Sequence, residues 1–201
     1  MKTRFILIRH GQTEWNRVER FRGRADLPLN ETGLAQAQKT APRLARENII
    51  AIYASPLQRA LQTAKPLADA FKLEIQQHPG LLDLDFGALE GMTGEEAKQA
   101  FPEIIAAWRA TPGKVKFPKG GSLKAVNARV ENLFADLLAK HAGETVALVT
   151  HRVVCHAILC KALGLKSDAL WHIRQDNAGI SIFEKRDEGF VVTLMNETSH
   201  L

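Results

Sequence analysis

Short apolar runs alternate along this chain with segments in which apolar side chains recur at every third or fourth position. Short continuous runs are typical of buried strands, whereas the longer spacing is typical of helices with one buried face. Strands are predicted at residues 4–8, 49–53, 73–77, 145–149, 179–184 and 190–194. The last two enclose an Asp-Glu-Gly turn, which predicts a hairpin.

Helices are predicted in the segments between these strands. Asn30 is expected to cap a helix over residues 31–46, because its side chain can accept hydrogen bonds from the free N–H groups of the first turn. Ser55 is expected to cap the next helix, with Pro56 at its first position. Further helices are predicted at residues 95–108, with an interruption at Pro102, at 122–140 and at 153–163.

The order of these elements predicts a three-layer α/β/α fold. Strands and helices alternate up to residue 77, helices follow, and the chain ends with a strand, a helix and a hairpin. Such an order favours a mostly parallel central sheet with an antiparallel edge. The 201 residues suffice for one well-buried domain, and no linker, repeat or low-complexity tract divides them, so a single domain over residues 1–201 is expected.

The composition narrows the classes of partner. Hydrophobic residues make up 45% and charged residues 24% of the chain, which is ordinary for a globular protein and argues against long disordered stretches. The net charge is +5, yet the basic residues form no block and the chain holds one Tyr, so nucleic-acid binding is not favoured. The arginines between residues 17 and 24 suit attraction of a small anion instead.

Two cysteines and the distribution of apolar runs bear on location. Cys155 and Cys160 lie in one predicted helix and face different directions, so we expect two buried, reduced thiols. No apolar run approaches the ~18 residues of a membrane span, and the N-terminal residues lack the pattern of a secretory signal. We therefore expect a cytosolic protein with no membrane partner. No apolar stripe separates from the core pattern to mark an interface, which leaves a homodimer open.

The first predicted strand ends in the string Leu7-Ile8-Arg9-His10-Gly11-Gln12-Thr13. Carboxyl ends of strands in open α/β sheets are where ligands bind. There a cation (Arg9), an imidazole (His10) and a glycine that admits close backbone approach (Gly11) stand together, which suits attack on a phosphoryl group. A lone Arg-His pair would equally fit a strand that ends in a polar turn, so the interpretation depends on the longer string.

That longer string, Ile-Arg-His-Gly-Gln-Thr-Glu-Trp-Asn at residues 8–16, resembles the signature of the histidine phosphatase superfamily. This family shares its fold with cofactor-dependent phosphoglycerate mutases. The resemblance implies that His10 is a nucleophile that becomes phosphorylated and that Arg9 neutralises charge on the phosphoryl oxygens. Asn16 is expected to add a neutral hydrogen bond to the same group.

Two further segments are similar to motifs of the family. In Ala-Ser-Pro-Leu-Gln-Arg-Ala-Leu-Gln-Thr-Ala at residues 54–64, the resemblance implies that Arg59 reaches the phosphate, where a helix N-terminus also favours an anion. In Leu-Val-Thr-His at residues 148–151, it implies that His151 is the second catalytic histidine and that it binds the phosphoryl group in its protonated form. His156, on the following helix, lacks this context and is expected to be structural.

Family members carry an acid in a Leu-x-Glu-x-x-x-Gly context, and the corresponding segment is Leu-Leu-Asp-Leu-Asp-Phe-Gly at residues 81–87. The register puts Asp83 at the acid position, where it would protonate the leaving alkoxide and then accept a proton from water. Aspartate is one methylene shorter than the usual glutamate, so its reach is open, and Asp85 and Glu90 are the alternatives. Cationic side chains take the place of metal ions, so no metal or other cofactor is expected.

Arg22 and Arg152 stand where relatives commonly hold small or neutral residues. Each would favour substrates with a second anionic group if its side chain points inward, and each would be a solvated surface cation otherwise. Both are candidate substrate-binding residues.

These features predict a metal-independent phosphomonoesterase that acts on small phosphorylated metabolites through a phosphohistidine intermediate. The resemblance implies that mutases keep the phosphoenzyme dry with extra segments, for which this chain shows no obvious counterpart. A cofactor-dependent phosphoglycerate mutase is the alternative enzyme. A non-catalytic protein that binds a phosphorylated ligand is the alternative of another class, if Asp83 does not reach the site.

Overall fold

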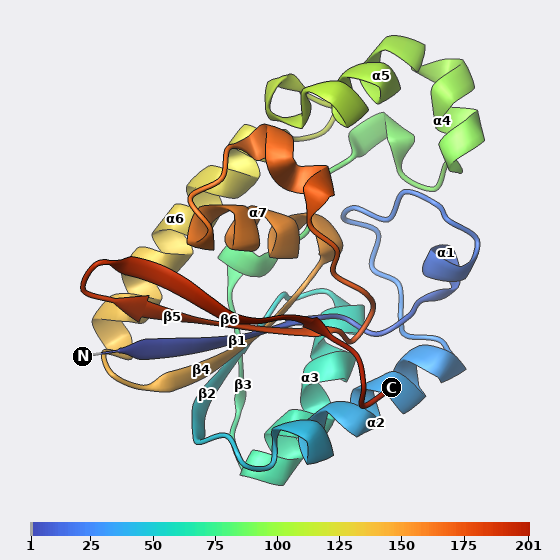
Figure 1. Cartoon of the computed structure of the whole chain (residues 1–201). Helices are drawn as coiled ribbons and strands as arrows, with labels where there is room; N and C mark the ends of the chain where they lie inside the picture. Colours follow the sequence, from blue (N-terminus) through green and yellow to red (C-terminus); the bar gives the residue numbers. More distant parts are fainter. Residues whose placement is uncertain (1) are drawn as a thin grey trace.

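The computed structural model describes residues 2–201 and contains one six-stranded sheet in the order β3-β2-β4-β1-β5-β6 (Figure 1). The strands are β1 (Thr3–Arg9), β2 (Ile49–Ala54), β3 (Ile75–Gln77), β4 (Thr145–Thr150), β5 (Ile180–Arg186) and β6 (Gly189–Glu197). The first four run parallel to one another, whereas β5 pairs antiparallel with β1, and β6 pairs antiparallel with β5. All the predicted strands form, and the predicted α/β fold with an antiparallel edge is confirmed.

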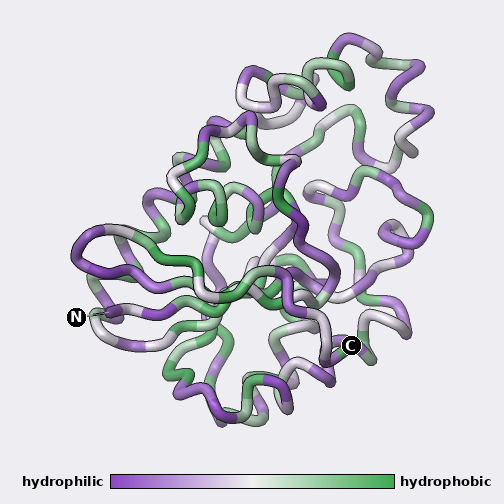
Figure 2. The backbone as a smooth tube through the Cα atoms, in the orientation of Figure 1, coloured by the Kyte–Doolittle hydropathy of each residue, from purple (hydrophilic) through white to green (hydrophobic). Residues whose placement is uncertain are grey.

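Helices cover both faces of this sheet. They are α1 (Glu14–Arg17), α2 (Glu31–Leu44), α3 (Gln58–Phe71), α4 (Gly94–Ala100), α5 (Pro102–Ala110), α6 (Leu123–Lys140) and α7 (Arg152–Ala162). Figure 1 shows α2 and α3 on one side of the sheet and α6 and α7 on the other. In Figure 2 the central strands carry hydrophobic positions, whereas the turn between β5 and β6 is hydrophilic.

The first strand shows why both faces need cover. Phe5 and Leu7 belong to the core that includes α6 and α7, whereas Ile6 and Ile8 belong to the core that includes α2 and α3. Successive side chains of a strand point to opposite faces, so a continuous apolar run is stable only where both faces are buried.

The long segment between β3 and α6 departs from the strand–helix alternation. It contains α4 and α5, which lie apart from the sheet (Figure 1), and short 3₁₀ turns, of which η1 (Pro79–Leu81) and η2 (Gly87–Leu89) flank Asp83. The predicted interruption of the helix over residues 95–108 is confirmed, because α4 ends at Ala100 and Pro102 begins α5.

The two predicted helix caps have different outcomes. The side chain of Asn30 accepts from the backbone N–H of Gly33 at 2.9 Å, which confirms it as the cap of α2. The prediction that Ser55 caps α3 is wrong, because the helix begins at Gln58 and the capping position is Leu57. The hydroxyl of Ser55 is 3.4 Å from the Leu57 N–H but only 2.7 Å from a ring nitrogen of His151, which is the stronger bond.

Both cysteines are buried and free, as the spacing predicted. Among residues 2–201, no helix combines the length and the apolar character needed to cross a lipid bilayer.

Candidate active site

Parallel pairing of β1 with β4 brings the two motif histidines together. His10 directly follows β1 and His151 directly follows β4, and the strands pair in register up to Arg9 and Thr150. The N–H of His10 donates to the Thr150 carbonyl at 2.9 Å. The two imidazole centroids are 5.2 Å apart, and both rings are buried. Adjacent strand ends therefore place two histidines that lie far apart in the sequence next to each other at one edge of the sheet.

His10 has the protonation pattern of a nucleophile. Its Nδ1 is 2.7 Å from the Gly11 carbonyl oxygen, which can only accept, so Nδ1 carries the hydrogen and Nε2 keeps a free lone pair. Burial and the charges of Arg59 and Arg9 hold the pKa of His10 well below its ordinary value. The ring is therefore uncharged near neutral pH.

The loop that carries His10 is held through its backbone. The N–H of Gly11 donates to the Thr63 hydroxyl at 2.9 Å, and the Asn177 side-chain amide donates to the carbonyls of His10 and Gly11 at 2.9 and 3.1 Å. A Cβ on Gly11 would lie 2.6 Å from the Gly33 carbonyl oxygen in the first turn of α2, so this position requires glycine. The nucleophile is thus fixed from three sides.

Arg59 is the most deeply buried of the predicted arginines. Its side chain is fully buried, and its Nη1 and Nη2 donate to the carbonyls of Ala25 and Gly23, each at 2.7 Å. Its Nε donates to Nδ1 of His151 at 3.1 Å. The second motif and the third are therefore joined by a direct hydrogen bond.

His151 is neutral in this structure. Its Nδ1 accepts from Arg59, so Nε2 carries the hydrogen and donates to the Ser55 hydroxyl at 2.7 Å. Burial and the charges of Arg59 and His10 lower the pKa of His151 well below its ordinary value. The predicted protonated form of His151 therefore concerns the phosphate-bound enzyme, because here burial and the neighbouring cations favour the neutral ring.

The three candidate acids occupy different places. The Oδ2 atom of Asp83 is 3.4 Å from Nη2 of Arg59 and 3.8 Å from Nδ1 of His151. The side chain of Asp85 accepts from the N–H of Gly87, and that of Glu90 accepts from the N–H groups of Arg24 and Phe86. Both carboxylates therefore stabilise the irregular segment between β3 and α6. The shorter aspartate side chain therefore reaches the pair of Arg59 and His151.

Asp83 is buried, and burial raises the pKa of its carboxyl against the opposing charges of Arg59 and Arg22. It holds a proton to a higher pH than an ordinary aspartate. Its other oxygen, Oδ1, accepts from the Leu84 N–H at 2.9 Å, so Oδ2 is the oxygen that lies toward Arg59 and His151.

The remaining predicted cations take up separate positions. Arg9 is 7% exposed and donates to the Gln175 carbonyl at 2.7 Å; burial and the charges of Arg22 and Arg152 lower its pKa to about 9. Burial also lowers the pKa of Arg22 to about 10, and its Nη1 donates to the carbonyls of Trp15 and Arg20. Arg22 is thus a half-buried residue held against the loop of the first motif.

The other two predicted binding residues are less enclosed. Arg152, the first residue of α7, stacks its guanidinium 5.2 Å from the ring centre of Trp171. The side-chain oxygen of Asn16 accepts from the N–H and the hydroxyl of Thr13 and so completes the capping box of α1. The Asn16 carbonyl is therefore engaged in structure, which leaves its NH₂ group for any ligand.

The sequence profile described as the histidine phosphatase superfamily (branch 1) matches residues 5–198. The chain belongs to this superfamily. Phosphoserine phosphatase 1 of Hydrogenobacter thermophilus is 36% identical over 198 residues, which cover 98% of this chain and 94% of that protein. The metal-independent phosphoserine phosphatase of Arabidopsis thaliana is 32% identical over 202 residues, which cover 99% and 83%.

A solved structure of Bacillus stearothermophilus YhfR is similar to this histidine phosphatase with a TM-score of 0.93 at 30% identity, and the match covers 98% of both chains. Other relatives are named as probable phosphoglycerate mutases. The family and the phosphatase names together support a phosphoric monoester hydrolase. Within residues 2–201, no group of three or more His, Cys, Asp and Glu side chains is arranged to hold a metal ion.

One residue of this histidine phosphatase that the sequence did not single out is Arg129, on α6. Its Nη1 donates to the carbonyls of Pro79, Gly80 and Leu82 at 3.1, 3.3 and 2.8 Å, and its Nη2 donates to the Asp83 carbonyl at 3.3 Å. It therefore holds the irregular segment that carries Asp83. Its place on an amphipathic helix gave no local sign of this role.

Proposed function

We propose that this chain is a metal-independent phosphomonoesterase that hydrolyses small phosphorylated metabolites of the cytosol through a phosphohistidine at His10. The observation that carries the proposal is the convergence of the motif residues: the free lone pair of His10 Nε2, the ring of His151 with its centroid 5.2 Å from that of His10, and the buried carboxyl of Asp83, 3.8 Å from His151. A nucleophile that is uncharged at neutral pH and an acid that keeps its proton are the two groups that such a reaction requires.

In the first step, His10 Nε2 attacks phosphorus, the P–O bond to the leaving group breaks, and Asp83 gives its proton to the departing alkoxide. Arg9 and Arg59 neutralise charge on the equatorial oxygens. His151 becomes protonated as the phosphate dianion enters, because the anion offsets the positive charges that, together with burial, lower the pKa of His151.

In the second step, water attacks phosphorus, the P–N bond breaks and inorganic phosphate leaves. The Asp83 carboxylate takes a proton from that water and so returns to its starting state. His10 regains its free Nε2. The hydrogen bond from Nδ1 to the Gly11 carbonyl keeps the same tautomer throughout.

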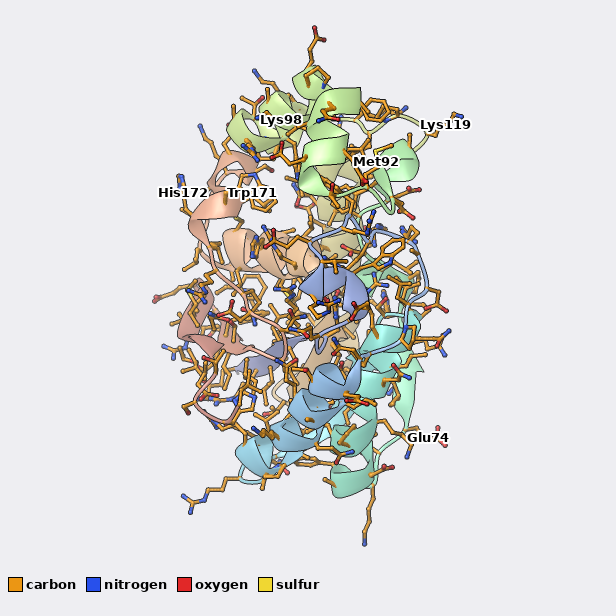
Figure 3. The ribbon with its side chains drawn as sticks, turned by 90° about the vertical axis from the view of Figure 1, so that its right-hand side faces the viewer. Glu74, Met92, Lys98, Lys119, Trp171 and His172 are labelled. Atoms are coloured by element: carbon orange, nitrogen blue, oxygen red, sulfur yellow. The ribbon has the colours of Figure 1, made fainter. Side chains whose placement is uncertain are left out.

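The test is to incubate the protein with p-nitrophenyl phosphate and with 3-phosphoglycerate, and to follow inorganic phosphate and 2-phosphoglycerate. We expect phosphate release from both esters, and a base-stable phosphorylated peptide containing His10 after a rapid quench. His10→Ala should lower phosphate release by more than about a thousandfold, because no other group replaces the nucleophile. His172→Ala, an exposed histidine on η4 (Ser167–His172; Figure 3), is the matched control and should retain activity.

Isomerisation of 3-phosphoglycerate with negligible phosphate release would favour a mutase. Binding of phosphate without turnover of either ester would favour the non-catalytic alternative.

A further inference from the structure

The guanidinium of Arg9 is buried but held by few contacts. Among residues 2–201, its side chain makes one hydrogen bond, from Nη1 to the Gln175 carbonyl at 2.7 Å, and its Nε is buried without a hydrogen-bond partner. A cavity of about 290 Å³ borders the same side chain, so packing does not fill all the space around it. The direction of the guanidinium therefore depends on that one carbonyl.

This anchor orients the guanidinium without neutralising it. A carbonyl carries no net charge, and in the part of the chain that the structure describes no carboxylate forms an ion pair with Arg9. Among these residues, Asp176 is the one carboxylate in the cavity wall, and it pairs with Arg174 at 2.9 Å and accepts from the Asn196 amide at 2.9 Å. The charge of Arg9 thus stays available to an anion, and it already contributes to the lowered pKa of His10.

The side chain of Gln175 holds the segment that carries this carbonyl. It is buried, and its Nε2 donates to the Gly179 carbonyl at 2.6 Å. Its Oε1 accepts from the Ser181 hydroxyl at 2.7 Å, and that hydroxyl accepts from the Asn196 N–H at 2.9 Å. Both halves of the amide are therefore bonded, and they tie residue 175 to the start of β5.

Residues 175–179 bind Arg9 at two points. The Arg9 N–H donates to the Gly179 carbonyl at 3.3 Å, and the Ala178 N–H donates to the Arg9 carbonyl at 3.0 Å, so the main chain is anchored at one end of the segment. The guanidinium is anchored at the other end, on Gln175. Because the Gln175 amide bonds the Gly179 carbonyl, it fixes the separation of the two anchors. This separation determines how the Arg9 side chain extends from β1.

We propose that Gln175 is a positioning residue: its buried amide sets the place of its own carbonyl, and that carbonyl directs the Arg9 guanidinium toward the phosphoryl group. The inference rests on the proposed function, since it takes the phosphoryl group to lie beside His10 and Arg9. Gln175 acts through Arg9 and not on the substrate. Without its amide, the guanidinium can turn into the adjoining cavity while its charge stays in the protein.

The test measures the Kd of orthovanadate by titration calorimetry on the whole chain, which requires no turnover. Orthovanadate has the shape and charge of phosphate and can take up a fifth ligand, so it binds more tightly and weakened affinities stay measurable. For Gln175→Met, which keeps the length of the side chain and removes its hydrogen bonds, we expect the Kd to rise about three- to tenfold. Gln77→Met, at an exposed position at the end of β3, is the matched control and should leave the Kd unchanged.

A double-mutant cycle separates positioning from a general effect on the fold. In an Arg9→Met background the guanidinium contact is already lost, so Gln175→Met should change the Kd by less than about twofold. An equal rise in both backgrounds, or no rise in the wild-type background, would overturn the positioning role. If Gln175→Met does not fold, Ser181→Ala takes its place in the cycle, because it removes only the donor to Oε1 and should give a smaller rise that likewise depends on Arg9.

The two proposals fail in different ways. Absence of ester hydrolysis would reject the phosphatase, and the Kd values would still decide whether Gln175 acts through Arg9. If orthovanadate does not bind the wild type, no oxyanion site lies beside Arg9 and the positioning role is rejected with it.

Discussion

The two halves of the active site are held by different means. His10 and His151 follow two paired strands, and the backbone ladder of β1 and β4 fixes their separation. Asp83 lies in a segment whose regular structure is limited to the 3₁₀ turns on either side of it, and its place depends on the side chains of Arg129 and Arg59. The nucleophile is therefore positioned by main-chain pairing, whereas the acid is positioned by two arginines.

This difference predicts different sensitivity to substitution. Backbone hydrogen bonds in a buried sheet survive most single side-chain changes, because no side chain supplies them. A loop held through one guanidinium can shift when that group is removed, while the sheet stays folded. Changes to the side chains that support Asp83 should thus disturb the geometry of the site more than changes to the side chains around the histidines, which the paired strands hold in place.

Apart from removal of the nucleophile itself, the largest effect is expected for Asp83→Asn, which keeps the shape of the side chain and removes its proton. We expect kcat for an alkyl phosphate to fall by about 10²- to 10⁴-fold, because the alkoxide then leaves unprotonated. The loss should be much smaller for p-nitrophenyl phosphate, whose leaving group needs little protonation. Steady-state rates on both esters are the measurement, with Asp85→Asn as the control. An equal loss on both would mean that Asp83 is not the acid.

The pH profile of the wild type gives a second check on the same residue. Only the protonated carboxyl can donate, so kcat/KM for an alkyl phosphate should fall as pH rises through the pKa of Asp83. Burial raises that pKa, so the fall should begin above the range of an ordinary aspartate. This fall in kcat/KM with rising pH should be absent from the residual activity of Asp83→Asn. If the fall persists in that variant, it is caused by the titration of another group.

A smaller effect is expected for Arg129→Met, which removes the four hydrogen bonds to the Asp83 segment. We expect kcat for an alkyl phosphate to fall by about 10- to 100-fold, with a smaller loss for the aryl ester, because the acid is displaced and not removed. Arg129→Lys should recover part of the activity, and Lys124→Met, exposed on the same helix, is the control. Equal losses on both esters would show that Arg129 acts only on stability.

The smallest effect is expected for Ser55→Ala, which changes a side chain that supports a histidine and leaves both histidines in place. This change removes the acceptor of the His151 Nε2–H, so the ring loses one of the bonds that set its tautomer. We expect kcat/KM to fall by about three- to tenfold, in line with one neutral hydrogen bond. Ser55→Thr keeps a hydroxyl and should lie nearer to the wild type. A loss as large as that of Arg129→Met would contradict the comparison of the two regions.

The sequence was sufficient for the histidine side, because its features are local. An apolar run with a polar end predicts a strand and the residue at its tip, and two such strands side by side bring their tips together. His10, Arg59 and His151 could therefore be assigned from short motifs. Their roles in catalysis stay predictions until the variants are measured.

The sequence was insufficient where one side chain serves a distant segment. Ser55 before Pro56 is the local pattern of a helix cap, yet its hydroxyl bonds a histidine at the end of another strand. Arg129 has the spacing of a solvated residue on a helix, yet it donates to carbonyls 46 to 50 positions earlier in the chain. Burial of Arg22 and of His156 likewise depends on packing between elements, which no local pattern encodes.

The contact of Gly11 with Gly33 has a mechanical consequence. Neither residue has a side chain, and a Cβ on Gly33 would lie 2.0 Å from the Gln12 carbonyl oxygen, so two lengths of bare peptide meet without a spacer. Peptide planes have no rotamers through which to absorb a displacement. A sideways movement of helix α2 would therefore move the backbone of the turn that carries His10. Helix α2 thus helps to position the nucleophilic nitrogen, although it contributes no reacting atom.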